Sequence, residues 1–258
     1  DYFYGFLGGG NTPMNPTLEV NGKETKLTGS LPDLLTDEAL RFVEANQTRP
    51  FAVSLHYRAP HTPYAPVPEV DSAPFQTLDP TIPDFKGLDV AYTKRLYREY
   101  YASVHSVDRN LGRLLAALDK LDLTRKTIVM FTSDHGSQFP FGKWNAYDAG
   151  VRTPLLAAWP DRIRPGTTSD AMVSWIDLLP TCLDAAGGDA PAGVSGRSFL
   201  GVLRGTAATH RDRVFVTHSG DGEMNRYPIR AVRTRAWKFI RNLDPAAEHH
   251  THVDRGKN

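Results

Sequence analysis

The residues best suited to chemistry lie in one stretch, TSDHGSQFPFGKWNAYDAGVRTP, which follows the apolar run 128–131. Asp134 and His135 stand side by side there, and Lys143 comes shortly after them. Carboxylate oxygen suits calcium or magnesium and also zinc, whereas imidazole nitrogen favours zinc and other borderline metals. The pattern therefore indicates a metal-dependent hydrolase, and residue type alone does not fix the metal.

A second candidate is His61, in the stretch APHTPYAP, a few residues after the apolar run 51–55. The runs 51–55 and 128–131 are both predicted strands, and in open parallel sheets ligands bind beyond the carboxyl ends of strands. If the two strands are neighbours, His61 lies close to Asp134 and His135. We therefore predict that these side chains converge on one point.

Each of these residues also has a simpler structural interpretation. An aspartate after a strand often caps the next helix or closes an Asx-turn. A histidine in a proline-rich loop often only packs there, and a single lysine is usually a solvated surface residue. Taken one at a time, Asp134, His61 and Lys143 are better explained in this way. By spacing and chemistry alone, the hydrolase is one hypothesis among others.

Helices and strands are predicted to alternate along the chain. Apolar residues recur at three- and four-residue spacing between Asp89 and Leu121, which predicts a long helix. The runs 128–131 and 154–160 predict strands, and the segment 173–188 predicts a second helix that ends at glycines. This alternation indicates an α/β fold with a largely parallel sheet flanked by helices.

The other segments are predicted to be shorter elements and loops. LEVNGKETKL contains an Asn-Gly turn signal and predicts a hairpin. A helix is predicted to begin with Thr36 as its N-cap, and residues 67–87, rich in proline and aspartate, predict a surface excursion. After Gly205, three short predicted strands add a small antiparallel C-terminal piece.

The composition narrows the class of protein. Of 258 residues, 40% are hydrophobic and 23% are charged, which is typical of a globular protein. The formal net charge of +1 gives no field that would recruit nucleic acid or an anionic membrane, so neither partner is expected. No apolar stretch approaches the roughly 20 residues of a membrane helix. The single cysteine, Cys182, excludes an internal disulfide framework and a multi-thiolate metal site.

Two consecutive stretches, TIVMFTSDHG and GKWNAYDAGVRTPLLAAWP, resemble the second signature region of the sulfatases, in the alkaline-phosphatase-like superfamily. Four further stretches resemble the family in the family's order, so the resemblance covers about residues 1–205: DYFYGFLGG, PFAVSLHYRAPHTPYAP, YYASVHSVDRNLGRLLAALDKLDL and SWIDLLPTCLDAAG. The later stretch THSGDGEMNRYPIRAVRTRAWKFIRNL is similar to the sulfamidase-like branch, the heparan N-sulfatases, which act on N-sulfated glucosamine.

The resemblance implies a role for each candidate residue. Asp134 and His135 would be two ligands of one divalent cation, normally calcium in sulfatases, although asparagine is commoner at the second position. His61 matches the histidine that contacts the sulfate and protonates the leaving atom, and Lys143 matches the lysine that holds a sulfate oxygen. Sulfuryl transfer requires such cationic groups around the sulfate and an acid at the leaving atom.

The resemblance also assigns two further residues and a domain boundary. Arg152 is expected to form a structural salt bridge rather than a substrate contact, and His218 is a candidate for lining the sugar pocket. A catalytic part is predicted over residues 1–205, and the start of an antiparallel subdomain over residues 206–258. By family, the protein would be exported to the periplasm, the exterior or the lysosome, although no targeting signal is visible.

The sulfatase nucleophile is a formylglycine made from a Cys/Ser-x-Pro-x-Arg motif, and that motif is absent from this sequence. The family's Asp-Asp pair, which supplies the other metal ligands, and its Lys-x-His segment are absent as well. The chain therefore resembles the carboxyl-side part of a sulfatase catalytic domain, an incomplete fold. We expect the isolated chain to lack sulfatase turnover and to be prone to aggregation.

Three functions follow from this reading. The leading hypothesis is a sulfuric ester or sulfamate hydrolase that acts on sulfated sugars of the glycosaminoglycan type and uses one divalent cation, calcium. A phosphohydrolase or phosphonate hydrolase of the same superfamily also uses Asp-His metal pairs, often with zinc or manganese. A non-catalytic binding module would retain the pocket without the chemistry.

Overall fold

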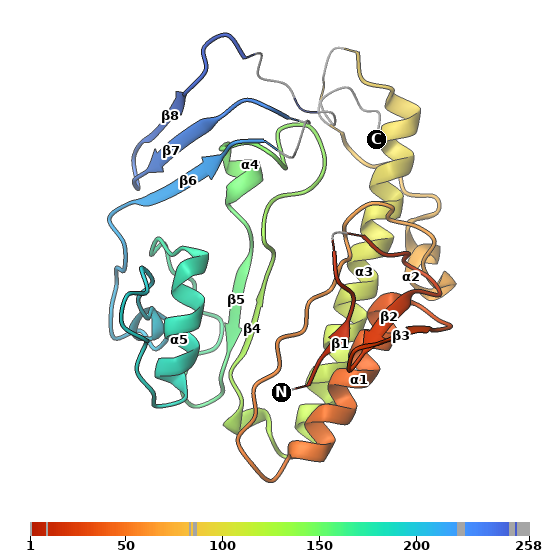
Figure 1. Cartoon of the computed structure of the whole chain (residues 1–258), viewed down its shortest axis with the longest axis vertical. Helices are drawn as coiled ribbons and strands as arrows, with labels where there is room; N and C mark the ends of the chain where they lie inside the picture. The colour runs from red at the N-terminus through yellow and green to blue at the C-terminus, as the bar shows by residue number, and fades with distance from the viewer. Residues whose placement is uncertain are drawn as a thin grey trace. The chain divides into compact units, whose positions relative to one another are not determined.

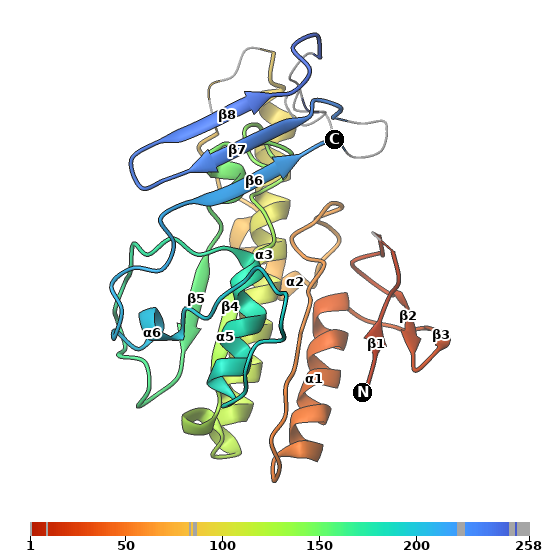
Figure 2. The ribbon, with the colours of Figure 1, turned by 60° about the vertical axis from the view of Figure 1, so that its left-hand side comes forward.

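The computed structural model of the chain describes residues 2–8, 10–82, 84, 87–220, 225–247 and 251. The chain divides into two units, Asp1–Thr124 and Arg125–Asn258. Figures 1 and 2 show the helices and strands of each unit. Within the described ranges, no helix is both long enough and apolar enough to cross a membrane.

The first unit begins with a small antiparallel sheet of three strands, β1 (Tyr4–Gly5), β2 (Thr17–Val20) and β3 (Lys23–Lys26). The turn between β2 and β3 consists of Asn21 and Gly22, whose φ angles are 49° and 84°. Positive φ at both positions is what a two-residue type I′ turn requires, and the Asn-Gly pair supplies it. The predicted hairpin is confirmed.

Two long helices, α1 (Leu31–Asn46) and α3 (Val90–Lys120), pack together in the first unit (Figure 1). The prediction for α3 is confirmed, and Asp89 caps it by accepting the N–H of Tyr92 at 3.0 Å. The predicted start of α1 is wrong, because Thr36 lies inside the helix and donates its hydroxyl to the carbonyl of Pro32 at 2.8 Å. Proline is tolerated in a first helical turn, so the helix extends back to Leu31.

Two predictions for the segment between α1 and α3 need correction. Residues 51–55 form no strand, because no described segment pairs with them and a strand needs a hydrogen-bonded neighbour. The predicted surface excursion contains two short helices, α2 (Glu69–Ser72) and η1 (Ala73–Phe75). Asp71 of α2 is fully buried, so part of this segment belongs to the interior.

The short helix η2 (Thr124–Lys126) begins at the last residue of the first unit, and the second unit then forms the strands β4 (Val129–Thr132) and β5 (Leu155–Ala158). These two strands pair antiparallel, with Thr132 opposite Leu155. The largely parallel sheet that the alternation predicted is not formed among the described strands, all of which pair antiparallel. The connection from β4 to β5, residues 133–154, contains only the short helix α4 (Asp148–Val151), whereas parallel neighbours are usually joined by a longer crossover helix that packs on the sheet.

The predicted helix over 173–188 is confirmed as η3 (Trp175–Asp177) followed by α5 (Leu178–Ala185). Asp177, at the junction, is fully buried. Its carboxylate accepts hydrogen bonds from Nε and Nη2 of Arg211, and Oδ2 lies 3.1 Å from Nε2 of His210. Asp177 therefore ties the start of α5 to the segment that precedes the last sheet.

The last sheet is antiparallel, as predicted, and consists of β6 (Val214–His218), β7 (Ile229–Arg233) and β8 (Lys238–Asn242) (Figure 2). A short helix, α6 (Leu200–Leu203), precedes it. One face of the sheet forms a small core with the connection between β4 and β5; the buried members are Ala146, Tyr227, Ile229 and Ala231. This core brings the sheet against the residues that follow the Asp-His pair. The domain boundary at residue 205 stays a prediction.

Replacing Asp177 with asparagine should destabilise the second unit and weaken its acid sensitivity. At neutral pH we expect the free energy of unfolding to fall by about 3 to 5 kcal/mol, because Arg211 and His210 lose a buried carboxylate partner. Burial raises the pKa of Asp177, but the hydrogen bonds from Arg211, from two backbone N–H groups and from His210 outweigh burial and lower the pKa to about 2. Stabilisation by this carboxylate is therefore complete above about pH 5 and is lost as the pH falls through the folded-state pKa.

The difference in unfolding free energy between wild type and Asp177→Asn should thus narrow by about 1 kcal/mol between pH 7 and pH 3. Urea unfolding followed by tryptophan fluorescence measures it, because all four tryptophans lie in the second unit. Asp189→Asn, at an exposed position, controls for loss of a carboxylate. A difference that does not change with pH would contradict the prediction.

Candidate functional site

The Asp-His pair lies where β4 ends. Asp134 comes two residues after the strand, and its side chain is 82% exposed. The indole N–H of Trp175 donates to the carbonyl of Asp134 at 3.1 Å, and the hydroxyl of Ser133 donates to the carbonyl of His135 at 2.8 Å. These bonds fix the backbone of the pair while the carboxylate faces solvent.

The imidazole of His135 is oriented by the next peptide group. Its Nδ1 lies 2.8 Å from the carbonyl oxygen of Gly136, and because a carbonyl oxygen only accepts, Nδ1 carries the hydrogen. In the neutral ring Nε2 then carries the lone pair, which is the arrangement of a metal-binding imidazole. This Nε2 lies 3.3 Å from Oδ2 of Asp134, so two donor atoms face the same point.

Two donors at this separation fit adjacent positions around one cation. Calcium–oxygen distances of about 2.3 to 2.6 Å place ligands at right angles roughly 3.2 to 3.7 Å apart, a range that includes the distance between Asp134 and His135. The same separation also suits an ion pair with a protonated imidazole. Calcium takes about six to eight ligands, and no group of three or more His, Cys, Asp or Glu side chains is gathered within the described ranges. The pair therefore fits part of a cation site.

The contacts of Asp134 also show whether it caps a helix or closes a turn, the two simpler interpretations of an aspartate after a strand. Its Oδ1 accepts the N–H of His135 at 3.0 Å, which is a contact of a turn. The next helix, α4, begins at Asp148, so Asp134 is not a helix N-cap. One carboxylate oxygen thus serves the turn, and the other faces the imidazole.

Residues 136–150, which we call the closed loop, return to the Asp-His pair through a close backbone contact. The N–H of Gly136 donates to the carbonyl of Gly150 at 2.8 Å. A Cβ on Gly136 would lie 1.8 Å from the carbonyl oxygen of Ala149, and a Cβ on Gly150 would lie 2.3 Å from that of Gly142. Only glycine allows these approaches, since Cβ atoms essentially never come within 3.0 Å of such an atom.

Lys143 belongs to the closed loop and is half-buried. Its N–H donates to the carbonyl of Ser137 at 2.9 Å, and its Nζ lies 4.4 Å from the centroid of the Trp144 ring. The side-chain amide of Asn145, which is buried, donates to the carbonyl of Gly142 at 2.6 Å. The structure therefore holds Lys143 in a loop of fixed backbone that begins directly after the Asp-His pair.

The C-terminal sheet supports the closed loop. Tyr227, which is 1% exposed, donates its hydroxyl hydrogen to the carbonyl of Trp144. Lys238 of β8 donates from Nζ to the carbonyl of Ala146 at 2.8 Å and forms an ion pair with Asp148. Figures 1 and 2 both show α4 lying against this sheet. Tyr227 and Lys238, which are 83 and 92 residues away from the loop residues they contact, thus hold the loop in place.

His218 reaches the closed loop through Tyr227. The two rings are in contact, with centroids 4.8 Å apart, and Nε2 of His218 donates to the carbonyl of Asn225 at 3.0 Å. This places His218 beside the support of the loop, at the end of β6. Its role in lining a sugar pocket stays a prediction.

Arg152 is exposed and follows α4 directly. Lys238 and Arg233 form the ion pairs of Asp148, the latter at 3.6 Å, whereas Arg152 donates its backbone N–H to the carbonyl of Asp148 at 2.8 Å. The hydrogen bond from Lys238 lowers the pKa of Asp148, and the charges of Arg233 and Arg152 lower it further. The structural salt bridge expected of Arg152 stays a prediction, and so does the alternative that Arg152 contacts the substrate.

His61 belongs to the first unit. Its N–H donates to the carbonyl of Arg58 at 2.8 Å, and its Nδ1 donates to the carbonyl of Thr62 at 2.7 Å. The side chain is partly buried and lines a small cavity of about 20 Å³ together with Ser103 and Ser106 of α3. The convergence of His61 with the Asp-His pair of the second unit stays a prediction.

Four residues that hold this site were not singled out from the sequence: Asn145, Trp175, Tyr227 and Lys238. Asn145 lies within the stretch first examined, so its place in the turn was accessible to prediction. The other three act on the closed loop or the Asp-His pair from 41 to 92 residues away. No local sequence pattern marks contacts of that range.

Two family models match the chain. The Sulfatase model matches residues 1–188, and the model described as N-sulphoglucosamine sulphohydrolase, C-terminal, matches residues 135–255. The Asp-His pair therefore lies in the Sulfatase match, and His135, the closed loop and the last sheet fall in the range of the second model.

Curated relatives are sulfatases of animals and bacteria. The steryl-sulfatase of Mus musculus is 32% identical over 244 residues, which cover 84% of this chain and 35% of that protein. The N-acetylglucosamine-6-sulfatase of Capra hircus is 30% identical over 239 residues, which cover 81% of this chain and 43% of that protein. The chain thus spans less than half the length of these relatives.

Solved structures confirm the α/β, alkaline-phosphatase-like fold. A protein solved in complex with its substrate D-glucosamine-2-N,6-O-disulfate superposes with a TM-score of 0.84 at 22% identity, covering 96% of this chain and 68% of that one. A phosphonate monoester hydrolase from Silicibacter pomeroyi superposes less well, with a TM-score of 0.59 at 24% identity, covering 85% of this chain and 55% of that one. At these identities the likeness establishes the fold.

Replacing Gly136 with alanine should open the closed loop. Its Cβ would lie 1.8 Å from a backbone oxygen, which cannot be relieved by turning a side chain. We expect the second unit to lose about 3 kcal/mol of unfolding free energy, measured by urea unfolding. The amides of residue 136 and of Lys143 should exchange faster than in wild type. Gly188→Ala is the control, since its Cβ would make an ordinary contact of 3.7 Å. Wild-type stability in Gly136→Ala would show that the loop is not closed in this way.

Proposed function

Because the chain belongs to the sulfatase family, we propose that it forms part of a sulfuric ester or sulfamate hydrolase that acts on sulfated carbohydrates. One observation carries the proposal: Oδ2 of Asp134 lies 3.3 Å from Nε2 of His135 at the end of β4. Lys143 lies on the closed loop that begins beside this pair. A pair that could hold a cation, followed by a loop that carries a lysine, suits the binding of a small divalent anion.

In this proposal, Asp134 and His135 hold two positions of a divalent-cation site, and calcium is the expected metal. A cation bound there would place positive charge next to the sulfate oxygens. Lys143 contributes a further positive charge to a non-bridging oxygen. His61, in its imidazolium form, keeps the Nδ1 hydrogen on the carbonyl of Thr62 and donates the Nε2 proton to the leaving oxygen or nitrogen. Transfer of the sulfuryl group places negative charge on the leaving atom, while the sulfate oxygens carry theirs throughout, so an acid and cationic groups are needed at those two places.

Sulfated glucosamine is the proposed substrate class. The second family model takes its description from an N-sulphoglucosamine sulphohydrolase and covers the closed loop and the last sheet. The goat relative is named for 6-sulfated N-acetylglucosamine, and a structurally similar protein was solved with a disulfated glucosamine. His218, beside Tyr227, is the proposed contact to the sugar. Export from the cytosol is part of this proposal, since such glycans lie outside it.

None of the residues named above is the sulfatase nucleophile. Sulfatases attack sulfur with a formylglycine, and residues 1–258 contain no Cys/Ser-x-Pro-x-Arg motif from which it could form. The residues named above therefore account for binding the sulfate and for protonating the leaving atom. They do not supply the attacking group.

Cation binding by the Asp-His pair can be measured with terbium, a luminescent substitute for calcium. Trp175 contacts the backbone of Asp134, so its indole should sensitise terbium bound there. We expect Asp134→Asn and His135→Ala to weaken terbium binding about tenfold or more, and calcium to compete. Asp170→Asn removes an equally negative but 90% exposed side chain and should leave binding unchanged. Equal binding by wild type and Asp134→Asn would contradict the assignment.

Sulfate recognition can be measured by calorimetry with glucosamine N-sulfate, in the presence of calcium. Lys143→Met should weaken binding about tenfold, because a charge-assisted hydrogen bond is lost. Lys126→Met, at an exposed position of η2, is the matched control. Unsulfated glucosamine should bind detectably less. Tighter binding of glucosamine 6-phosphate than of glucosamine N-sulfate would favour the phosphohydrolase alternative. No binding of glucosamine N-sulfate would contradict the proposal.

A further inference from the structure

Residues 58–68, which we call the His61 loop, depend on side chains for their shape. Prolines occupy positions 60, 63, 66 and 68, and a proline has no N–H with which to form a backbone hydrogen bond. The segment is neither helix nor strand. The position of the imidazole is therefore set by the groups that fix the two ends of the loop.

Arg58 and Tyr64 fix the first part of the His61 loop. The guanidinium of Arg58 donates to the carbonyls of His61, at 3.4 Å, and of Thr62. Tyr64 is 2% exposed and packs edge-on against Tyr100 of α3, with ring centroids 5.5 Å apart. This part of the loop is thereby held on itself and on α3.

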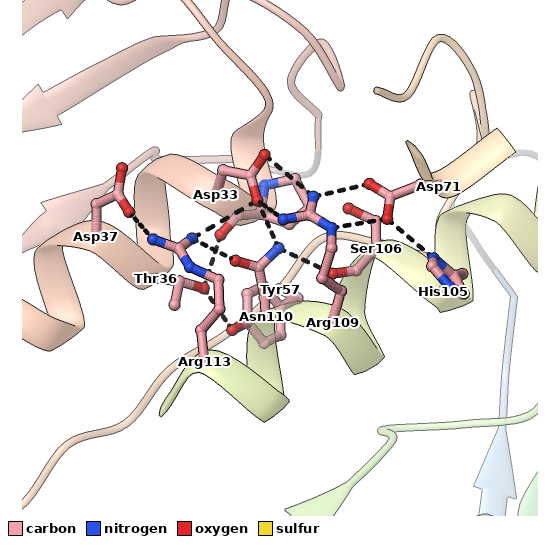
Figure 3. Close-up of polar contacts among 11 residues, drawn as sticks. Asp33, Thr36, Asp37, Tyr57, Asp71, His105, Ser106, Arg109, Asn110 and Arg113 are labelled. Carbon is pink, nitrogen blue, oxygen red and sulfur yellow. Dashed lines mark hydrogen bonds and ion pairs between the residues drawn. The ribbon is translucent and has the colours of Figure 1, made fainter. Parts of the chain in front are cut away.

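Asp71 fixes the other end of the loop. Its N–H donates to the carbonyl of Pro68 at 2.9 Å, which joins α2 directly to the loop. Its carboxylate, fully buried, accepts from Nε and Nη2 of Arg109, both at 2.8 Å, and Oδ1 also lies 2.9 Å from Nδ1 of His105 (Figure 3). Two parallel hydrogen bonds to one guanidinium fix direction as well as distance.

The balance of forces at Asp71 favours the ionised carboxylate. Burial raises the pKa of Asp71, but the hydrogen bonds from Arg109 and His105 outweigh it and hold the pKa below its ordinary value. The carboxylate is therefore charged under ordinary conditions. A charge in the interior makes the position of α2 on α3 specific, since any displacement would leave it unpaired.

Arg109 also binds a carboxylate of α1, so the two carboxylates that it holds can be compared. Its Nη1 lies 2.9 Å from Oδ1 of Asp33, and Asn110 donates to the same oxygen at 2.8 Å (Figure 3). One guanidinium thus holds two carboxylates. Asp33 belongs to α1, whereas Asp71 belongs to the helix that continues the His61 loop.

The anchor lies next to the cavity that His61 lines. Ser106 of α3 is one helical turn before Arg109 and therefore on the same face of the helix. Ser106, His61 and Val67 all line this cavity. A shift of α2 along α3 would move Val67 and the end of the loop relative to Ser106, and so would change where the imidazole lies.

We propose that Asp71, held by Arg109, is a positioning residue for His61. The inference rests on the proposed function, in which His61 is the acid. Asp71 touches neither substrate nor metal in this account. It fixes α2 against α3 and thereby fixes the imidazole, whose Nδ1 hydrogen is directed at the carbonyl of Thr62.

The test is the NMR signature of His61 in the full chain labelled at histidine, with the His61 signal assigned by His61→Gln. In wild type we expect the tautomer with hydrogen on Nδ1. In Asp71→Asn the His61 ring should average between the two tautomers, so this single signature should be lost. The amide of His61 should also exchange about tenfold faster. Asp33→Asn removes the other carboxylate from the same guanidinium and should change neither measurement.

Arg109→Lys is the second variant in case Asp71→Asn does not fold, because lysine keeps the charge but cannot form the two parallel bonds. It should disturb the His61 signature in the same way. Asp71→Glu, which keeps a carboxylate, should disturb the signature less than Asp71→Asn does. An unchanged signature in a folded Asp71→Asn or Arg109→Lys would overturn the proposal, as would an equal change in Asp33→Asn. Failure of the proposed function would show separately, as absence of sulfated-sugar binding by wild type.

Discussion

The candidate site depends on one backbone contact, the approach of Gly136 to Ala149 and Gly150. A side chain at Gly136 would lie 1.8 Å from a backbone oxygen, so the loop can close only on glycine. Closure has two effects at once. It returns the chain from Lys143 to Gly136, directly after the Asp-His pair, and it leaves the carbonyls of Trp144 and Ala146 in contact with Tyr227 and Lys238. The backbone that carries Lys143 is thus fixed by main-chain contacts of the loop.

The two units use the same electrostatic arrangement to hold their parts together. In each unit a fully buried aspartate, Asp71 or Asp177, accepts two hydrogen bonds from one arginine and a further one from a histidine. Both arginines are adjacent to, or a few residues from, the histidine. Such a cluster adds little net stability over apolar packing, but it allows only one arrangement of its partners. Short helices that bury little apolar surface, such as α2, gain a defined position in this way.

The sequence was informative where structure is decided locally and misleading where it is decided at long range. The Asn-Gly turn, the helix capped by Asp89 and the three closing strands each follow from neighbouring residues, and all were predicted. The direction of strand pairing was not, because it depends on which distant segment lies alongside β4. The burial of Asp71 was missed for the same reason, since its partner Arg109 is 38 residues away. For the site, adjacency of Asp134 and His135 was evident, whereas the orientation of the imidazole required coordinates.

The central proposal is that His61, Asp134, His135 and Lys143 act on one sulfate group. Paramagnetic broadening by Mn²⁺ tests it most directly, because manganese suits a site of carboxylate and imidazole ligands and broadens the NMR signals of nuclei near it. With histidine-labelled protein, the account predicts that Mn²⁺ broadens the signals of both His135 and His61, and that Asp134→Asn abolishes both effects. Broadening of His135 while His61 stays sharp would contradict the account, since the proposed acid would then lie far from the proposed cation.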